Sequence, residues 1–144
     1  MKIAIVSDHA GFKMKQKIIS YLISKDYELK DLGSYSDECS DYPDFAHPLA
    51  LAIENKEFDL GISLCGSGNG ISITANKYQG IRSAVCWEVK IAELARHHNN
   101  ANICALPARF LDEKKARKIV DAFLSTDFEG GRHQRRIEKI PIKY

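Results

Sequence analysis

The stretch Leu60–Ile73, which reads LGISLCGSGNGISI, decides how the rest of the chain is interpreted. A mostly apolar run ends at Cys65, and glycines follow at positions 66, 68 and 70. This pattern is typical of a buried strand that passes through a tight loop into a helix. Glycine reaches positive φ values readily, so backbone N–H groups in such a loop can turn toward one anion. A helix N-terminus also favours a thiolate. We therefore predict an anion-binding loop beside a reactive cysteine.

Strand-like and helix-like segments alternate along the whole chain. The predicted strands are residues 2–7, 27–32, 59–64, 81–86 and 102–106. The predicted helices are residues 12–24, 69–77 and 88–97, one that opens at Asp41-Tyr42-Pro43 and that Asp41 can cap, and one capped by Asp112. This alternation predicts an α/β fold, a single doubly wound, Rossmann-like domain over residues 1–144. Its five-stranded parallel sheet would be covered by helices on both faces. The basic segment at about 130–144 is expected to pack as a tail or arm.

Composition and charge exclude several classes of protein. The chain has 144 residues, 44% of them hydrophobic and 28% charged, with a formal net charge of +2, as in one globular domain. This charge gives no argument for a nucleic-acid or membrane partner. No signal peptide and no apolar run of membrane-spanning length is evident, so we expect a cytoplasmic protein. The cysteines at 39, 65, 86 and 104 lack the short paired spacing of a zinc or dithiol motif.

The glycine loop does not fit the common nucleotide-binding motifs. A dinucleotide fingerprint would require glycine at position 71, which is Ile71, and a phosphate-binding loop of the Gly-Lys-Ser/Thr type is absent. The glycines could also serve only as a tight turn between strand and helix. In a doubly wound sheet, ligands bind outside the carboxyl ends of the strands. That rule places Asp8, His9, Cys65 with its loop, and the segment after Cys86 on one rim.

Two further groups of residues carry candidate chemistry. His97 and His98 end a predicted helix, and without a further ligand at suitable spacing we favour acid/base work over metal binding. Arg132, Arg136 and Lys139 would share one face of a helix, and two guanidinium groups one turn apart match a phosphate dianion. A solvated basic tail and a nucleic-acid contact are the alternatives, although no aromatic residues are interleaved there.

Seven blocks, in order along the chain, resemble one family. They are Ser7-Asp8-His9-Ala10-Gly11, Asp41-Tyr42-Pro43, Cys65-Gly66-Ser67-Gly68-Asn69-Gly70, Ala75-Asn76-Lys77, Gly80-Ile81-Arg82, Arg96-His97-His98-Asn99 and Gly131-Arg132-His133-Gln134-Arg135-Arg136. Together they resemble the type B ribose-5-phosphate isomerases, which belong to a group that also acts on allose 6-phosphate and galactose 6-phosphate. The resemblance covers essentially the whole chain.

The resemblance implies an aldose–ketose isomerase that works through a cis-enediolate, without metal or coenzyme. It implies that Cys65 is the base and that His98 opens the furanose ring. The cradle for the developing oxyanion would be the Ser67 hydroxyl with the amides of Gly66, Gly68, Asn69 and Gly70. The sugar hydroxyls would lie near Asp8, Asp41 and Tyr42, and the phosphate would be bound by His9, Arg132 and Arg136 with help from Arg109 and Asn99.

The resemblance also implies a homodimer whose active site is shared, with His98, Asn99 and Arg109 coming from the partner. Further pairing of dimers into tetramers is left open. Another branch of the family has a glutamate base where this chain has Ile71, so the chain resembles the cysteine-base branch. Ribose 5-phosphate is the expected substrate. The alternatives are a six-carbon sugar phosphate or, in another class, a non-catalytic nucleotide-binding regulatory module.

Overall fold

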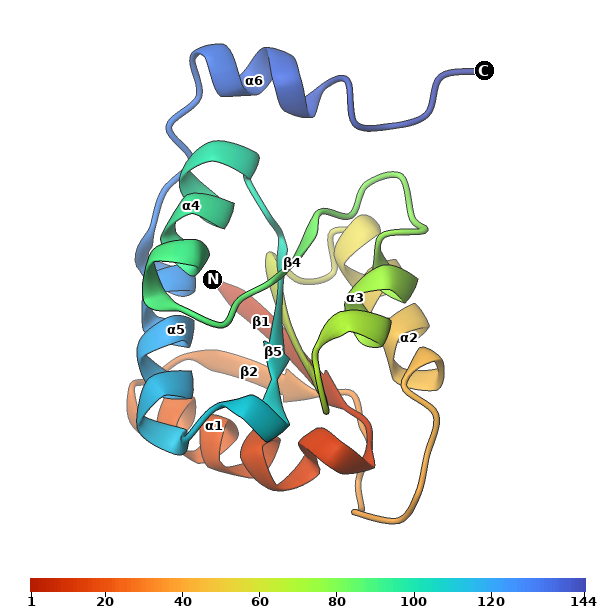
Figure 1. Ribbon diagram of the computed structural model, residues 1–144, viewed down its shortest axis with the longest axis vertical. Helices are drawn as coiled ribbons and strands as arrows, with labels where there is room; N and C mark the ends of the chain where they lie inside the picture. Colours follow the sequence, from red (N-terminus) through yellow and green to blue (C-terminus); the bar gives the residue numbers. More distant parts are fainter.

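The computed structural model describes residues 1–144 and contains one five-stranded sheet (Figure 1). The strands are β1 (Lys2–Ser7), β2 (Glu28–Asp31), β3 (Leu60–Cys65), β4 (Ser83–Val85) and β5 (Ile103–Pro107). They lie in the order β2-β1-β3-β5-β4, and every neighbouring pair is parallel. The chain therefore continues in opposite directions across the sheet after β1 and after β3. The topological switch point lies at the carboxyl ends of these two neighbouring strands.

Helices cover both faces of the sheet, which confirms the predicted fold class. They are α1 (Phe12–Ser24), α2 (Pro43–Glu54), α3 (Asn69–Ala75), α4 (Val89–Asn99), α5 (Glu113–Ser125) and α6 (Arg132–Ile137), with 3₁₀ turns η1 (His9–Gly11) and η2 (Ala108–Phe110). Helices α1, α4 and α5 contribute to one hydrophobic cluster, and α2 and α3 contribute to the other. None of the helices is long and apolar enough to cross a membrane.

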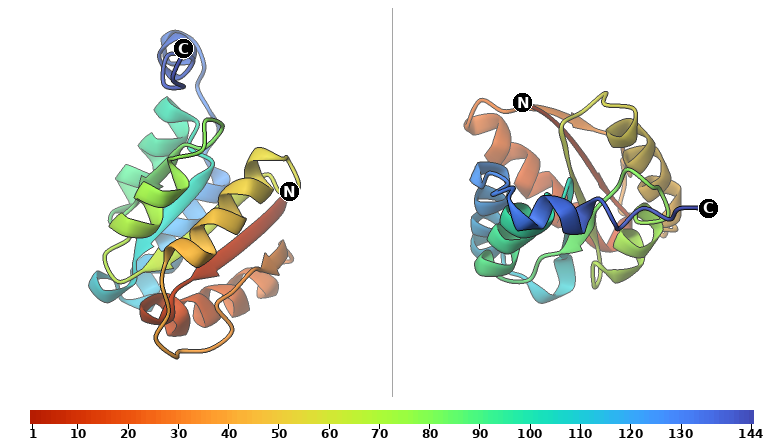
Figure 2. Two further views of the ribbon diagram at one scale, coloured as in Figure 1. Left: turned by 90° about the vertical axis from the view of Figure 1, so that its right-hand side faces the viewer. Right: turned by 90° about the horizontal axis from the view of Figure 1, so that it is seen from above.

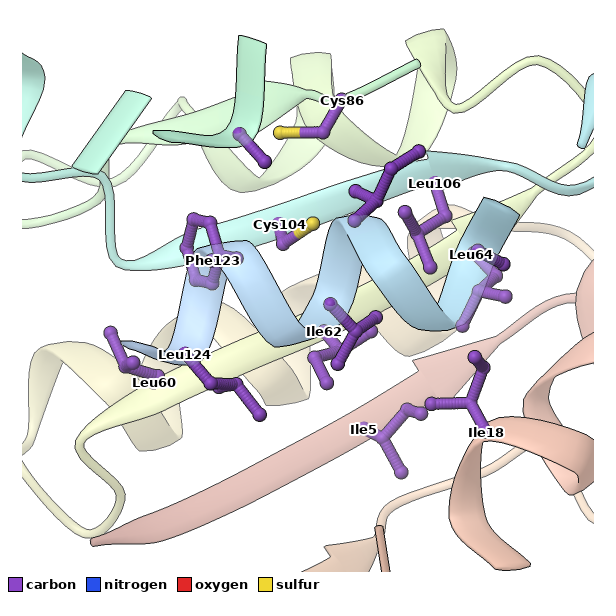
Figure 3. Close-up of a cluster of buried hydrophobic side chains, with 14 of the residues drawn as sticks. Ile5, Ile18, Leu60, Ile62, Leu64, Cys86, Cys104, Leu106, Phe123 and Leu124 are labelled. Carbon is purple, nitrogen blue, oxygen red and sulfur yellow. The ribbon is translucent and has the colours of Figure 1, made fainter. Parts of the chain in front are cut away.

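The strands feed the two clusters by alternation, because successive side chains in a strand point to opposite faces. In β1, Ile3 and Ile5 face α1 and α5, while Ala4 and Val6 face α2 and α3. Figure 3 shows Phe123 and Leu124 of α5 packed over the sheet. Cys65, at the end of β3, belongs to the opposite cluster. Its sulfur therefore lies between the sheet and the start of α3.

Of three local expectations, one is confirmed and two were wrong. Asp112 caps α5 as expected, because its side chain accepts from the Lys115 N–H. Asp41 does not cap α2, because the N-cap is Tyr42 and the Asp44 N–H donates to the main-chain oxygen of Asp41. Strand β4 is shorter than predicted because the Ile81 N–H bonds back to Tyr78 in a turn.

The C-terminal segment lies apart from the layers (Figures 1 and 2). Gly130 and Gly131 have φ values of 73° and 57°, a region that glycine occupies without steric penalty, and α6 follows directly. Helix α6 contacts the end of α4 and lies beyond the end of the sheet where the strands begin. It is therefore at the opposite end of the molecule from the loops that follow β1 and β3.

Candidate active site

A cavity of about 520 Å³ opens at the switch point, outside the carboxyl ends of the strands. It is lined by Asp8, His9, Ala10, Tyr42, Cys65, Gly66, Ser67, Gly70, Arg109 and Phe110. These residues come from the loops after β1, β3 and β5 and from the start of α2. Eight of the residues predicted from the sequence therefore meet in one cavity of one chain, whereas Asp41, Gly68 and Asn69 adjoin it in sequence without lining it.

The turn after β1 is built around Asp8 and Gly11. The Asp8 carboxylate accepts from the N–H groups of Ala10 and Gly11 at 3.0 and 3.2 Å, which fixes the start of η1. Gly11 packs directly on β3, because a Cβ atom at this position would lie 2.7 Å from the Cβ of Leu64. This close approach brings the loops after β1 and β3 together.

His9 is held by Ser40, a residue that the sequence analysis did not identify. The main-chain nitrogen of Ser40 lies 3.1 Å from His9 Nδ1, and the His9 N–H donates to Ser40 Oγ at 3.1 Å. His9 Nδ1 lies equally close, 3.1 Å, to the Ser40 carbonyl oxygen, so the tautomer of the ring decides whether Nδ1 accepts from the N–H or donates to the carbonyl. In either tautomer Ser40 fixes the orientation of the His9 ring.

Cys65 is 5% exposed and its sulfur faces the glycine loop. The Gly68 N–H donates to Sγ at 3.2 Å, so an anionic sulfur has a donor already in place. Gly68 itself has a φ of 76°, and a Cβ there would lie 3.2 Å from the main chain of Leu106 and Pro107. Only glycine fits this position without strain.

The amides of the loop divide into used and free donors. The Gly68 N–H is engaged by sulfur and the Asn69 N–H donates to Ser67 Oγ at 3.3 Å. The N–H groups of Gly66, Ser67 and Gly70 have no acceptor within the chain. The oxyanion cradle offered to a ligand is thus narrower than the full set of loop amides that the sequence suggested.

Two side chains close over the glycines. The Tyr42 ring lies on Gly70 so tightly that a Cβ there would be 2.3 Å from Tyr42 Cε1. The Arg109 side chain lies on Gly66, with Nη1 3.1 Å from the position of a Cβ, and the Arg109 N–H donates to the Gly66 carbonyl. Arg109 therefore belongs to the cavity of its own chain, which differs from the expectation that a partner supplies it. Phe110, 76% exposed at the rim, was also missed.

The remaining predicted residues gather at the other end of the molecule. His98 and Asn99 end α4, while Arg132 and Arg136 lie on α6, beyond the opposite end of the sheet (Figure 1). The His98 ring stacks on the His133 ring with centroids 4.2 Å apart and planes 12° apart. Glu129 Oε2 lies 3.8, 4.0 and 3.7 Å from Nε2 of His97, His98 and His133 respectively.

This histidine cluster has the composition of a metal site but not its geometry. Ligand atoms of His98, Glu129 and His133 lie within 4.8 Å of one another, a proximity that the spacing along the chain did not reveal. A metal ion lies close to the plane of each imidazole that binds it, along the nitrogen lone pair. Two parallel stacked rings cannot direct their lone pairs at one ion, so we interpret the cluster as a stacked pair beside a carboxylate.

A larger cavity, about 610 Å³, lies at the end of the sheet where the strands begin and includes Arg82 and Arg96 in its lining. Burial lowers the pKa of both guanidinium groups. Arg82 Nε donates to the carbonyls of Asn99 and Asn100 at 3.1 and 3.0 Å, and Arg96 Nη1 donates to the Ala101 carbonyl. These arginines satisfy carbonyls that the end of α4 leaves unpaired, and so support the turn that carries His98 and Asn99.

Nearly the whole chain is similar to proteins of one family. The family model described as Ribose/Galactose Isomerase matches residues 3–140. The chain is 47% identical to ribose-5-phosphate isomerase B of Escherichia coli over 139 residues, which cover 96% of this chain and 93% of that protein.

Solved structures give the same result. A ribose 5-phosphate isomerase from Thermotoga maritima is 54% identical, with a TM-score of 0.96 and 97% of each chain covered. Ribose-5-phosphate isomerase B of Mycoplasma genitalium, solved with bound ribulose-5-phosphate, is 47% identical with a TM-score of 0.92 and covers 96% of this chain and 93% of its own.

Proposed function

The chain belongs to the ribose/galactose isomerase family, and on this premise we propose that it interconverts ribose 5-phosphate and ribulose 5-phosphate. The single observation that carries the proposal is the position of the Cys65 sulfur. It is buried at the switch point, in the same loop as the Ser67 and Gly70 N–H groups, which have no acceptor within the chain. The similarity to a relative solved with bound ribulose-5-phosphate supports the choice of substrate.

The proposed reaction is a proton transfer between adjacent carbons. Cys65, as the thiolate, removes the proton from C2 of the open-chain aldose, and the electron pair of that bond forms a C1–C2 double bond while the C1 carbonyl becomes an oxyanion. The thiol then returns the proton to C1, and the hydroxyl proton on O2 moves to O1, which leaves a carbonyl at C2. Donors placed where negative charge develops lower the barrier most, and the N–H groups of Ser67 and Gly70 with the Ser67 hydroxyl fill this role.

The remaining residues of the cavity bind the rest of the sugar phosphate. Asp8 and Tyr42 face the region of the hydroxyl groups, while His9 and Arg109 bring an imidazole ring and a permanent positive charge to the phosphate. Asp41 adjoins the same rim. Outside the cavity of the same chain, His98 opens the furanose ring as an acid/base group, and Arg132 with Arg136 binds the phosphate, assisted by Asn99.

We further propose that two copies form a dimer in which the partner's His98, Asn99, Arg132 and Arg136 complete each cavity. The support is that one chain carries the two groups of residues at opposite ends of its sheet. Two copies related by a two-fold axis can bring opposite ends together twice, which gives two equivalent sites.

The catalytic proposal is tested with Cys65→Ala. We expect a loss of at least ~10²-fold in kcat for ribose 5-phosphate, because acid–base catalysis alone contributes ~10² to 10⁴-fold. Binding of a non-reacting pentose phosphate and the unfolding free energy should change little. Comparable kcat/KM values for ribose 5-phosphate, allose 6-phosphate and galactose 6-phosphate in the unchanged chain would refute the pentose assignment.

The shared site is tested by mixing two inactive variants, Cys65→Ala and His98→Ala, after unfolding and refolding them together. In a mixed dimer both defects fall in one site and the other site is intact. Random pairing should then restore about a quarter of the activity of the unchanged protein. A mixture that stays as inactive as its components would show that both residues act within one chain.

A further inference from the structure

His133 is a buried side chain without an assigned role. It lies on α6 between Arg132 and Arg136, is 4% exposed, and its Nε2 atom has no hydrogen-bond partner. A buried polar atom normally has a partner, since leaving it unpaired costs free energy. The His133 ring is thus buried with an unpaired nitrogen, and it stacks on the ring of His98.

The contact is a parallel stack, which constrains His98 in two ways. Centroids 4.2 Å apart and planes only 12° apart leave the His98 ring little freedom to turn. The same contact sets the position of α6 against the end of α4, and a hydrogen bond from the Glu129 N–H to the His97 carbonyl strengthens that junction. His98 and the two arginines of α6 therefore keep a fixed mutual arrangement.

Several charged groups surround the stacked rings of His98 and His133. Burial lowers the pKa of His133, and the charges of His98, Arg132 and Arg136 lower it further, while Glu129 opposes them. The other charged group facing the cluster is His97, which also lies beside Glu129. The Glu129 carboxylate faces both rings, with Oε2 4.0 Å from Nε2 of His98 and 3.7 Å from Nε2 of His133.

We propose that His133 is a positioning residue, whose buried ring holds the His98 imidazole at a fixed angle and in register with Arg132 and Arg136. The acid/base group and the phosphate-binding pair then approach one substrate as a preassembled unit. This inference rests on the proposed isomerase function. The geometry that carries it is the stack itself.

Two variants of similar size separate stacking from simple packing. His133→Phe keeps an aromatic ring, whereas His133→Leu keeps apolar volume without one. We expect His133→Leu to lower kcat for ribose 5-phosphate by about 10-fold, a part of the ~10²-fold or more that a positioned acid/base group supplies. His133→Phe should restore kcat to within about 3-fold, with the same pH profile as the unchanged protein.

Three outcomes would overturn the proposal. Full kcat in His133→Leu would show that apolar packing is enough and that the ring is not needed. Equal losses in both variants would show that an aromatic ring cannot replace the imidazole, so that stacking is not the function of His133. A shifted pH profile in His133→Phe would show that His133 itself titrates during turnover.

A measurement without substrate keeps the test independent of catalysis. The stacked ring shifts the nuclear magnetic resonance of the His98 Cε1 proton through its ring current, so His133→Leu should move this signal and His133→Phe should largely retain it. An unmoved signal in His133→Leu would refute the stack. If the unchanged chain isomerised no sugar phosphate, the proposed function would fail while this measurement still decided the geometry.

Discussion

Substitution of Gly70 by alanine provides a sharp test of the cavity geometry. The new methyl group would lie 2.3 Å from Cε1 and 2.5 Å from Cζ of Tyr42. The ring must withdraw by about 1 Å to reach ordinary van der Waals contact. Tyr42 is 38% exposed, so the ring can move outward without disturbing the core. The steric clash with the new methyl group is therefore relieved by a shift of the Tyr42 ring, which forms part of the cavity wall.

The expected result is a loss of activity with little loss of stability. Misplacement of a binding group by about 1 Å can cost ~10²-fold in rate, and we expect kcat/KM for ribose 5-phosphate to fall by ~10-fold to 10²-fold. The free energy of unfolding should change by less than about 1 kcal/mol, because alanine is favoured over glycine within a helix and offsets residual strain. Steady-state kinetics and urea unfolding measure the two quantities.

A double-mutant cycle with Tyr42→Ala supplies the control. Tyr42→Ala removes the ring that the methyl group strikes, so adding Gly70→Ala to this variant should have almost no further effect on kcat/KM. If Gly70→Ala leaves kcat/KM within about 3-fold of the unchanged protein, or if its effect is the same with and without the Tyr42 ring, the steric argument is wrong.

Three further predictions concern stability. Gly11→Ala places a methyl group 2.7 Å from Leu64 Cβ and 2.8 Å from the Leu64 carbonyl oxygen, and because main chain cannot yield we expect a loss of about 2 kcal/mol or more in urea unfolding. Lys15→Met removes a fully buried ammonium that donates to Asp31 Oδ1 at 2.7 Å and to the Ser34 carbonyl at 2.5 Å. Since Asp31 is one quarter exposed, we expect about 3 kcal/mol, the lower end for a broken buried pair, whereas Lys17→Met, which removes an exposed pair, should cost less than about 1 kcal/mol. The third concerns pH: the folded pKa of His133 is lowered from 6.5, so as pH falls below 6.5 the unfolded chain binds a proton that the folded chain resists, and stability falls. His133→Phe should lose less stability than the unchanged protein between pH 7 and pH 5, and parallel curves would contradict this.

The sequence predicted the sheet and the cavity because both depend on local patterns. The apolar runs around Ile3 and Ile62 were read correctly as buried strands, and the glycines after Cys65 marked the turn at the switch point. Parallel topology then brought Asp8 and Cys65 to the same rim, since the carboxyl ends of parallel strands share one edge.

Other features depend on contacts between residues far apart in the chain, and no local pattern reports them. Ser40 lies in a polar loop and reaches His9 across 31 positions. Glu129 and His133 approach His98 only because the glycines at 130 and 131 turn the chain back onto the end of α4. The expected Asp41 cap was wrong for a different reason. Asp41 is a residue type suited to capping, but α2 begins one position too late for it, because the N-cap is Tyr42.

The placement of the two groups of residues at opposite ends of the sheet has a consequence for how activity depends on the amount of protein. If each site combines the Cys65 cavity of one chain with the partner's His98 and arginines, a single subunit is inert. Dilution below the dissociation constant of the dimer would then reduce turnover per chain, and the initial rate would rise with the square of enzyme concentration in that range. The fraction of chains that are catalytically active would therefore depend on the total concentration of the protein.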